Sequence, residues 1–301
     1  MNDSKIGHII LMTGCSNDCI FCLLGKNHIE TEESIKKQEI KAWKNLQRYK
    51  KEGVTDIEIS GSDPLEYSKI IPMLKCIKKM GFQNIRIATH GKNLSNFNFT
   101  HELINAGVNL FTIPIYGSNS LIHDKITRIK GSFAHTIQGI KNVNKLNKKI
   151  AISCLVLEYN KNNLIDIVRL GMKYDVMNFC FNMTYLVQEN NFYFIPVKDL
   201  GKYMSKVFKF IIKSKSNVCF NEFPYCVFEG INPKILINSG KIFHSQKKYS
   251  FLGDKSGSIQ IPPFKIKTNI EMCNKCKAKN QCDGFFKKDI DIYGVGNIKP
   301  L

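Results

Sequence analysis

The sequence predicts an α/β protein, a partial (β/α)6 TIM-like barrel followed by a small, irregular, cysteine-rich C-terminal domain. The first observation behind this prediction is an alternation over about 210 residues: short apolar runs alternate six times with segments of helical periodicity. Such alternation is typical of parallel strands joined by right-handed crossovers. The second observation is that prolines and glycines become more frequent from residue 216 on, while helical periodicity fades. We therefore expect two domains, residues 1–215 and residues 216–301.

Six strand–helix units make up the first expected domain. The expected strands are residues 9–12, 56–60, 84–88, 110–115, 150–157 and 176–181. The expected helices are residues 33–51, 67–79, 99–105, 133–146, 164–174 and 198–214. Glycines such as Gly53 and Gly81 stand where helices are expected to end. Because eight units close a full barrel, six units predict a barrel that stays open.

Composition limits the class of protein. Apolar residues make up 43% of the 301 residues, which is enough to bury a full core. No apolar run approaches the roughly 20 residues that span a bilayer, and the N-terminus lacks the charged and apolar regions of an export signal. We therefore expect a cytoplasmic protein that does not act at a membrane. In that compartment thiols stay reduced and serve as metal ligands before they form disulfides.

The charge balance is strongly basic. Lysine and arginine number 44 against 25 acidic residues, a formal net charge of +19, and such a charge can indicate a polyanionic partner. However, the basic residues are dispersed over polar helix faces and form no stripe interleaved with aromatic residues. An RNA partner is therefore the less favoured alternative.

Three cysteines follow the first expected strand at spacings of three and two. Cys15, Cys19 and Cys22 lie in the loop at its C-terminal end, where barrels and open α/β sheets place their chemistry. Three thiolates can hold three corners of a [4Fe–4S] cluster and leave the fourth iron free to bind a substrate or cofactor. The alternative is a zinc site with His28 as the fourth ligand, or three unrelated buried cysteines.

The run Cys15-x3-Cys19-x2-Cys22, with Phe21 before the last cysteine, resembles the cluster motif of the radical S-adenosylmethionine (SAM) superfamily. The resemblance implies that the open iron binds the amino and carboxylate groups of SAM. It also implies that an electron from the cluster cleaves SAM to a 5'-deoxyadenosyl radical, and that Phe21 lies against the adenine. An electron donor such as a flavodoxin or ferredoxin follows from the same resemblance.

Motifs at the ends of later strands fit the same family. Gly61-Ser62-Asp63-Pro64 resembles its Gly-Gly-Glu-Pro element, which holds the SAM amino group, with serine and aspartate replacing the second glycine and the glutamate. His90 follows the third strand and can orient SAM or substrate, act as an acid or base, or cap the next turn. Ser118 resembles a serine that contacts the SAM ribose in the family. Asn160, after the fifth strand, is a weaker candidate for the ribose hydroxyls.

A second cysteine group lies near the C-terminus. Cys273-x2-Cys276-x5-Cys282, with Cys226 upstream, supplies four thiolates, which suit either zinc or a fully ligated [4Fe–4S] cluster. The segment resembles a reduced form of the SPASM or twitch extension of radical SAM enzymes, which implies one auxiliary cluster. The fourth ligand of this cluster is Cys226 or Cys219, or the fourth iron has no protein ligand. Cys76, Cys154, Cys180 and Cys219 have apolar neighbours and are expected as small core residues, Cys219 being the least certain.

The pair His123-Asp124 before a Gly-Ser-Phe helix start resembles peptide-modifying radical SAM enzymes. The resemblance therefore implies that the radical takes hydrogen from a peptide or a small molecule, as in a maturase. Two alternatives stay open: a radical SAM enzyme that modifies RNA, and a non-enzymatic zinc protein.

Overall fold

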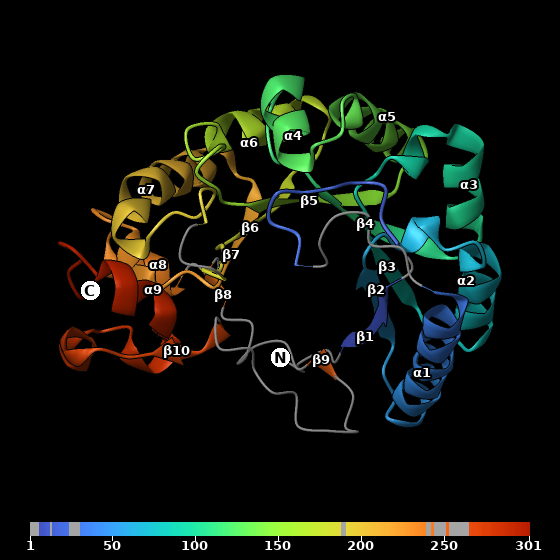
Figure 1. Ribbon diagram of the computed structural model, residues 1–301, viewed down its shortest axis with the longest axis horizontal. Coiled ribbons are helices and arrows are strands. Elements are labelled where there is room, and N and C mark those ends of the chain that lie inside the picture. The colour runs from blue at the N-terminus through green and yellow to red at the C-terminus, as the bar shows by residue number, and fades with distance from the viewer. Residues whose placement is uncertain are drawn as a thin grey trace.

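Nine parallel strands form one curved sheet (Figure 1) in the computed structural model, which describes residues 6–12, 14–23, 31–187, 191–238, 242–243, 251–252 and 265–301. The strands are β1 (Ile6–Leu11), β2 (Asp56–Gly61), β3 (Asn84–Ala88), β4 (Val108–Pro114), β5 (Lys149–Leu155), β6 (Asn178–Asn182), β7 (Asn217–Asn221), β8 (Ile242–Phe243) and β9 (Phe251–Leu252). Their order across the sheet is β8-β7-β6-β5-β4-β3-β2-β1-β9. The sheet is therefore an open arch with two short strands at its edges.

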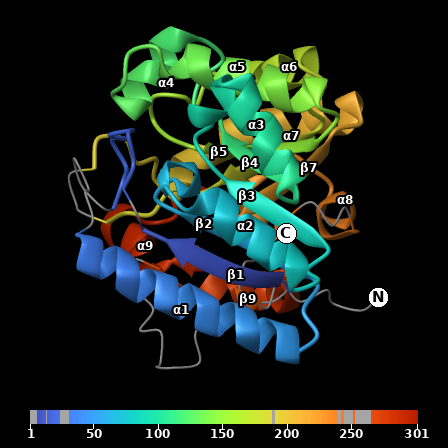
Figure 2. The ribbon, with the colours of Figure 1, turned by 90° about the vertical axis from the view of Figure 1, so that its right-hand side faces the viewer.

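Most helices cover the convex side of this arch, whereas the last described helix packs against the seventh at one end of it (Figures 1 and 2). The helices are α1 (Glu32–Lys51), α2 (Ile70–Lys79), α3 (Phe97–Asn105), α4 (Ser120–Thr127), α5 (Ser132–Lys145), α6 (Leu164–Lys173), α7 (Val197–Ser214), α8 (Pro233–Asn238) and α9 (Lys287–Tyr293). In the part of the chain that the structure describes, none of them combines the length and the apolar character needed to cross a bilayer.

The strands alternate between two environments. Ile57 and Ile59 of β2, like Ile113 of β4, are fully buried in the main core between sheet and helices. The residues between them, such as Ser60 and Thr112, line a cavity on the concave face. Because strand side chains alternate with a period of two, β2 and β4 each have one face that builds the core and one that borders the cavity.

The predicted fold class is confirmed, but the sheet has nine strands where six were expected, because β7, β8 and β9 were not predicted. A seventh parallel strand, β7, pairs with β6 in register and lies beyond residue 215, where the first domain was expected to end. It was missed because Val218-Cys219-Phe220 is a very short apolar run with no periodic helix of similar length after it. Helix α4 was also missed; Asn119 begins it by accepting a hydrogen bond from Ile122 N. The division of the chain at residue 216 stays a prediction.

The C-terminal segment packs against the barrel through a buried carboxylate. It contains the antiparallel pair β10 (Lys267–Thr268) and β11 (Phe285–Phe286), followed by α9. Asp289 of α9 is completely buried, and its Oδ2 accepts a hydrogen bond of 3.0 Å from Val197 N at the start of α7. Asp289 therefore acts as a helix cap supplied by a distant part of the chain. Burial raises its pKa to about 7, although the hydrogen bond from Val197 opposes the shift.

We expect the Asp289→Asn variant to be more stable than the wild type at pH 8.5 but not at pH 5. Protonated Asp289 is the form that the fold favours. The stability that this protonated form contributes is fully present below the unfolded-state pKa of about 3.9. It is lost as pH rises through the folded-state pKa of about 7. Asparagine keeps the acceptor for Val197 and carries no charge, so the difference in unfolding free energy should grow by about 1–3 kcal/mol over this range.

Anaerobic urea unfolding at both pH values measures this difference. Asp291→Asn, on the same helix but solvent-exposed, is the matched control and should show no such growth. A difference between Asp289→Asn and wild type that is the same at pH 5 and pH 8.5 would contradict the assignment.

Candidate active site

A cavity of about 410 Å3 opens at the C-terminal ends of the first strands. Cys15, Cys19 and Cys22 line one side of it, together with Phe21 of the same loop. Residues from β2, β3, β4 and β5 line the remainder, so the concave face of the sheet and the cysteine loop enclose a common space. The structure thus brings the three N-terminal cysteines together where the sequence predicted.

The cysteine loop is held by the far side of the barrel. Asp18 N donates to Thr127 O and Ile20 N donates to Ile126 O, both at 3.0 Å. These two carbonyls belong to the last turn of α4 and have no partner within that helix. The ring of Phe21 meets Tyr116 edge-on, with the ring centroids 5.0 Å apart. The cysteine loop follows β1. Helix α4 and Tyr116, just after β4, therefore hold this loop on the side opposite β1.

The three thiols fit an iron–sulfur cluster. Burial raises the pKa of Cys19 to about 12, and the neighbouring Cys15 and Cys22 add to the shift because adjacent thiolates repel one another. A bound cationic centre would relieve this repulsion by drawing the three thiolates to it. His28, the ligand of the zinc alternative, lies outside the described residues.

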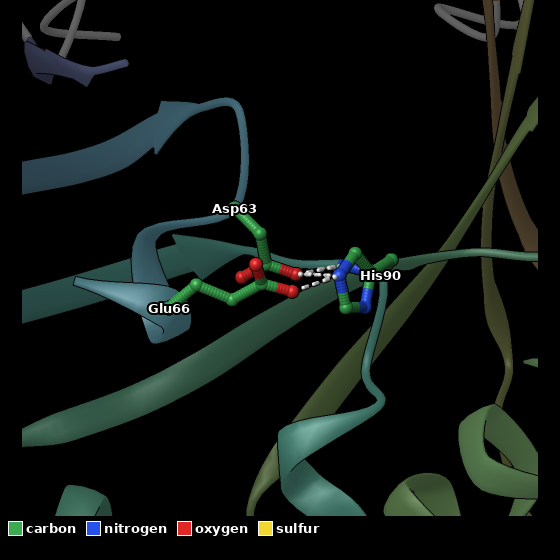
Figure 3. A group of neighbouring side chains, drawn as sticks. All are labelled: Asp63, Glu66 and His90. Atoms are coloured by element: carbon green, nitrogen blue, oxygen red, sulfur yellow. Dashed lines mark hydrogen bonds and ion pairs between the residues drawn. The ribbon is translucent and has the colours of Figure 1, made fainter. Parts of the chain in front are cut away.

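Asp63, Glu66 and His90 form a hydrogen-bonded group beside the cysteine loop (Figure 3). His90 Nε2 lies 2.9 Å from Asp63 Oδ2 and 2.9 Å from Glu66 Oε1. Burial alone would lower the pKa of His90, but the two carboxylates outweigh it and hold the pKa well above its usual value. Burial would likewise raise the pKa of Glu66, yet hydrogen bonds from His90 and Ser16 lower it to about 2.

These three side chains have the composition of a metal site, with their ligand atoms within 4.8 Å of one another. However, a metal needs an imidazole nitrogen without a proton, and His90 Nε2 is already the hydrogen-bond donor to the two carboxylates. His90 Nδ1 also accepts a hydrogen bond from Lys92 N at 3.2 Å, which is the turn-capping role expected as an alternative. We therefore read the group as a brace between strand ends.

The brace connects the loops after β1, β2 and β3. Ser16 N donates to Glu66 Oε1 at 3.1 Å, and Asp63 N donates to Gly14 O at 3.2 Å. Asp63 in turn accepts hydrogen bonds from Thr89 Oγ1 and from His90 N. The position of the cysteine loop therefore depends on residues from two further strands.

The turn after β2 requires a glycine. Gly61 has φ +138°, a conformation that other residues rarely adopt, and a Cβ built on it would lie 2.0 Å from Leu11 O. This close approach lets Ser62 N donate to Leu11 O at 3.1 Å. Gly61 and Ser62 line the cavity together with Phe21 and His90, and their contacts with SAM stay predictions.

Four other predicted SAM contacts do not line the cavity, and two of them, Asp63 and Pro64, lie in the turn after β2. Asp63 is fully buried, with its carboxylate committed to Leu65 N, Thr89 and His90. Its short side chain therefore turns into the protein, and Pro64 begins the following turn rather than facing the cavity. The direct contact expected between the Asp63 carboxylate and SAM is not supported by this geometry.

Ser118 and Asn160 also have structural partners. Ser118 N donates to Asn163 Oδ1 at 2.7 Å, and Asn163 Nδ2 donates to Ser118 Oγ at 2.9 Å. Asn160 is fully buried: its Oδ1 accepts from Leu157 N, and its Nδ2 donates to Leu155 O. These asparagine amides fix the loops after β4 and β5. Neither Ser118 nor Asn160 lines the cavity, and their ribose contacts stay predictions.

The sequence reasoning missed Tyr116, Thr112 and Ser153, which line the cavity, and Glu66 of the brace. A usable signal existed for two of them, because Thr112 and Ser153 fall at the non-apolar positions of the alternating pattern of their strands.

The pair His123-Asp124 has structural partners. Asp124 accepts hydrogen bonds from the N-terminus of α5, at Gly131 N and Phe133 N, and burial lowers the pKa of His123 to about 4.

The C-terminal cysteines line a second, smaller pocket. Cys226, Cys273, Cys276 and Cys282 all border it, together with apolar side chains that include Phe285. Burial, and then the other three thiols, raises the pKa of Cys226. Cys219, the alternative fourth ligand, lies instead on β7 against Cys180 of β6. The structure thus assembles four thiols from two segments that lie far apart in the sequence.

Removing the conformational freedom of Gly61 should strongly destabilise the fold. We expect Gly61→Ala to lower the unfolding free energy by more than about 2 kcal/mol, because the methyl group meets a backbone carbonyl that cannot move aside. Gly53→Ala is the matched control: it also has positive φ, at +71°, but nothing lies within 4 Å of the place its methyl group would take. It should lose only about 1 kcal/mol. Equal losses in urea unfolding would refute the close-approach argument.

Comparison with known proteins agrees with this site. The profile of the Radical SAM superfamily matches residues 9–171, which include the cysteine loop and the strands that line the cavity. Such a site, in which three cysteines of one loop face a cavity at the strand ends, defines the class of iron–sulfur enzyme that binds and cleaves SAM. The chain belongs to the radical SAM superfamily, and a [4Fe–4S] cluster and SAM are accordingly its cofactors.

Curated relatives share the first part of the chain. A probable GTP 3',8-cyclase of Methanocaldococcus jannaschii is 26% identical over 191 residues, which are 64% of this chain and 59% of that protein. The GTP 3',8-cyclase of Lactiplantibacillus plantarum is 24% identical over 167 residues, covering 54% and 49%. The chain therefore spans only about half to three-fifths of the length of these relatives.

Solved structures share the fold. Native anSMEcpe with bound AdoMet superposes with a TM-score of 0.66 at 15% identity, over 98% of this chain and 92% of that one. Streptococcus suis SuiB bound to the precursor peptide SuiA gives a TM-score of 0.58 at 17% identity, over 72% and 48%. The likeness to anSMEcpe includes the C-terminal segment with its cysteines.

Proposed function

We propose that this protein is a peptide-modifying radical SAM enzyme with an auxiliary iron–sulfur cluster, a maturase that abstracts hydrogen from a peptide or a related small molecule. The observation that carries the proposal is the convergence of Cys226, Cys273, Cys276 and Cys282 on a pocket separate from the SAM cavity. The likeness to anSMEcpe over nearly the whole chain, and to SuiB with its precursor peptide, supports it. We propose the segment after residue 216 as the auxiliary domain.

In this proposal the residues of the chain divide the work. Cys15, Cys19 and Cys22 hold the first cluster, which when bound supplies the electron that splits SAM into methionine and a 5'-deoxyadenosyl radical. Phe21 and Tyr116 form an aromatic wall against which the adenine can pack. The apolar and hydroxyl side chains of the concave face enclose the radical and keep water away from it.

The spread of the thiols supports iron–sulfur clusters over zinc. In the described part of the chain, no three cysteine sulfurs lie within 4.8 Å of one another. Zinc, with Zn–S bonds of about 2.3 Å, holds its thiolates within about 4 Å of one another. A cubic cluster carries its ligands on separate iron corners and accommodates sulfurs that lie further apart.

We further propose that the enzyme works in the reducing cytoplasm and receives electrons from a flavodoxin or ferredoxin.

The proposal predicts that Cys19→Ala abolishes SAM cleavage. The anaerobically purified wild type, given dithionite, should convert SAM to 5'-deoxyadenosine, and the variant should form less than about one hundredth as much because the cluster loses one of its three ligands. Cys76→Ala, a solvent-exposed cysteine of α2, is the control and should match the wild type. Cleavage by Cys19→Ala at the wild-type rate would exclude this site as the place of SAM reduction.

Metal content tests the second cluster independently. We expect about eight irons per wild-type chain and about four in Cys226→Ala, with slower but measurable SAM cleavage in the variant. Cys154→Ser, a buried cysteine at the β5 end outside both pockets, is the control for general loss of stability and should keep about eight. A colourless protein with zinc and no iron would sink both cluster assignments.

The curated relatives favour a second candidate, the conversion of a purine nucleotide, since they are GTP 3',8-cyclases. The net charge of +19 suits an anionic substrate of this kind, and it suits RNA for the same reason. Binding measurements with GTP and with RNA at low and high salt separate these readings. A strongly salt-dependent affinity for RNA supports the RNA alternative, and its absence at low salt removes it.

A further inference from the structure

Two cysteines outside both cysteine pockets lie against each other on the concave face of the barrel. Cys180 of β6 and Cys219 of β7 are paired in register, and their sulfurs are 2.8 Å apart. Adjacent strands of a parallel sheet are about 4.8 Å apart, which is within the separation that a disulfide bridges. The two thiols were expected to be core residues, but both are only partly buried, so reagents and substrates can reach them.

The pair continues a row of side chains that begins in the SAM cavity. Pro114 of β4 pairs with Ser153 of β5, Ser153 pairs with Cys180, and Cys180 pairs with Cys219. Pro114 and Ser153 both line the cavity. Since residues in register on neighbouring strands point to the same face of the sheet, the two thiols belong to the same interior layer as the cavity wall. Figure 1 shows β5, β6 and β7 side by side along the arch.

Asparagine amides tie the pair to that wall. Asn221 Nδ2 donates to Cys180 Sγ at 3.0 Å and to Asn182 Oδ1 at 2.9 Å, and Asn182 Nδ2 donates to Ser153 Oγ at 3.1 Å. Leaving a buried polar group without a hydrogen-bond partner costs free energy. A network whose side chains are hydrogen-bonded to one another therefore holds them in fixed positions.

The two sulfurs are not equivalent. Cys180 Sγ accepts hydrogen bonds from Asn221 Nδ2 and from the thiol of Cys219, and it donates to Asn182 Oδ1 at 3.7 Å. The hydrogen bond to Cys180, followed by burial, raises the pKa of Cys219. Cys219 is therefore the hydrogen-bond donor of the pair, and Cys180 is the sulfur that accepts its hydrogen.

We propose that Cys180 and Cys219 form a redox-active dithiol that reduces a carbon radical in the barrel, an inference that rests on the proposed function. The S–H bond of Cys219 breaks and its hydrogen atom goes to the carbon radical, which forms a C–H bond and leaves a sulfur radical. The sulfur of Cys180 then bonds to that sulfur, and the proton of the Cys180 thiol goes to water. The resulting radical anion gives one electron to an oxidised carrier of the iron–sulfur or flavin class, and a disulfide remains.

Deuterium transfer to the cofactor fragment tests this step without a known substrate. The anaerobic holoenzyme is incubated in D2O with SAM and dithionite, so that thiols carry deuterium and 5'-deoxyadenosyl radicals form in the empty barrel. We expect part of the 5'-deoxyadenosine to carry carbon-bound deuterium. Cys219→Ser should lower the deuterated fraction at least threefold while leaving total 5'-deoxyadenosine within twofold, and Cys76→Ser should change neither.

Disulfide mapping gives a readout that does not depend on turnover. The wild-type holoenzyme is equilibrated in glutathione buffers of increasing oxidation, alkylated and digested, and a Cys180–Cys219 cross-linked peptide should appear in the mass spectrum. Cys180→Ser should abolish the cross-link, even if Cys219→Ser folds poorly.

The outcomes separate the two proposals. A deuterated fraction that is equal in wild type and Cys219→Ser, or two thiols that stay separately alkylated in every buffer, would overturn the dithiol and leave the SAM chemistry standing. Absence of 5'-deoxyadenosine from the wild type as well would overturn the proposed function and, with it, the radical step assigned to the pair.

Discussion

The hydrogen bonds of His90 Nε2 to two carboxylates hold the active-site end of the barrel together. Asp63 and Glu66 belong to the turn after β2, His90 follows β3, and both carboxylates also reach the neighbouring loops through Ser16, Thr89 or backbone N–H groups. Burying such charges is costly unless every one is paired. Here both carboxylate oxygens of Asp63 and Oε1 of Glu66 accept hydrogen bonds. The interaction therefore contributes more to the position of the cysteine loop than to net stability, and a displaced cysteine would misplace the cluster.

The alternation of the strands explains why one sheet can serve two purposes. The helix-facing residues are large and apolar and form a core that fixes the strand register. Once the register is fixed, the residues between them lie on the concave face, where hydrogen bonds such as that from Asn182 Nδ2 to Ser153 Oγ hold them. Ser60, Thr112 and Ser153 reach the cavity in this way, and the Cys180–Cys219 pair follows from the same register two strands further on.

The sequence predicted those features that depend on local pattern. Six of the strands, their helices and the cysteine loop follow from periodicity and spacing, and they lie within a few residues of the expected positions. Side-chain direction could not be predicted in the same way. Asp63 carries the acidic character expected of its turn, yet partners from β3, 26 residues away, draw its carboxylate inward. Asn160 and Ser118 likewise lie at strand ends but are committed to loop hydrogen bonds, and Cys180 becomes chemically interesting only because β7 exists beside it.

The attachment of the cysteine loop to α4 has a consequence for the biogenesis of the protein. The hydrogen bonds from Asp18 and Ile20 to the carbonyls of Thr127 and Ile126 join positions more than a hundred residues apart. During synthesis the three cysteines leave the ribosome early, but their loop acquires its shape only after β4 and α4 have been made and have folded. Contacts of such long range form late and slowly. Loading of the cluster on this loop is therefore coupled to the completion of half the barrel. The second site is completed last, when Cys273, Cys276 and Cys282 close on Cys226.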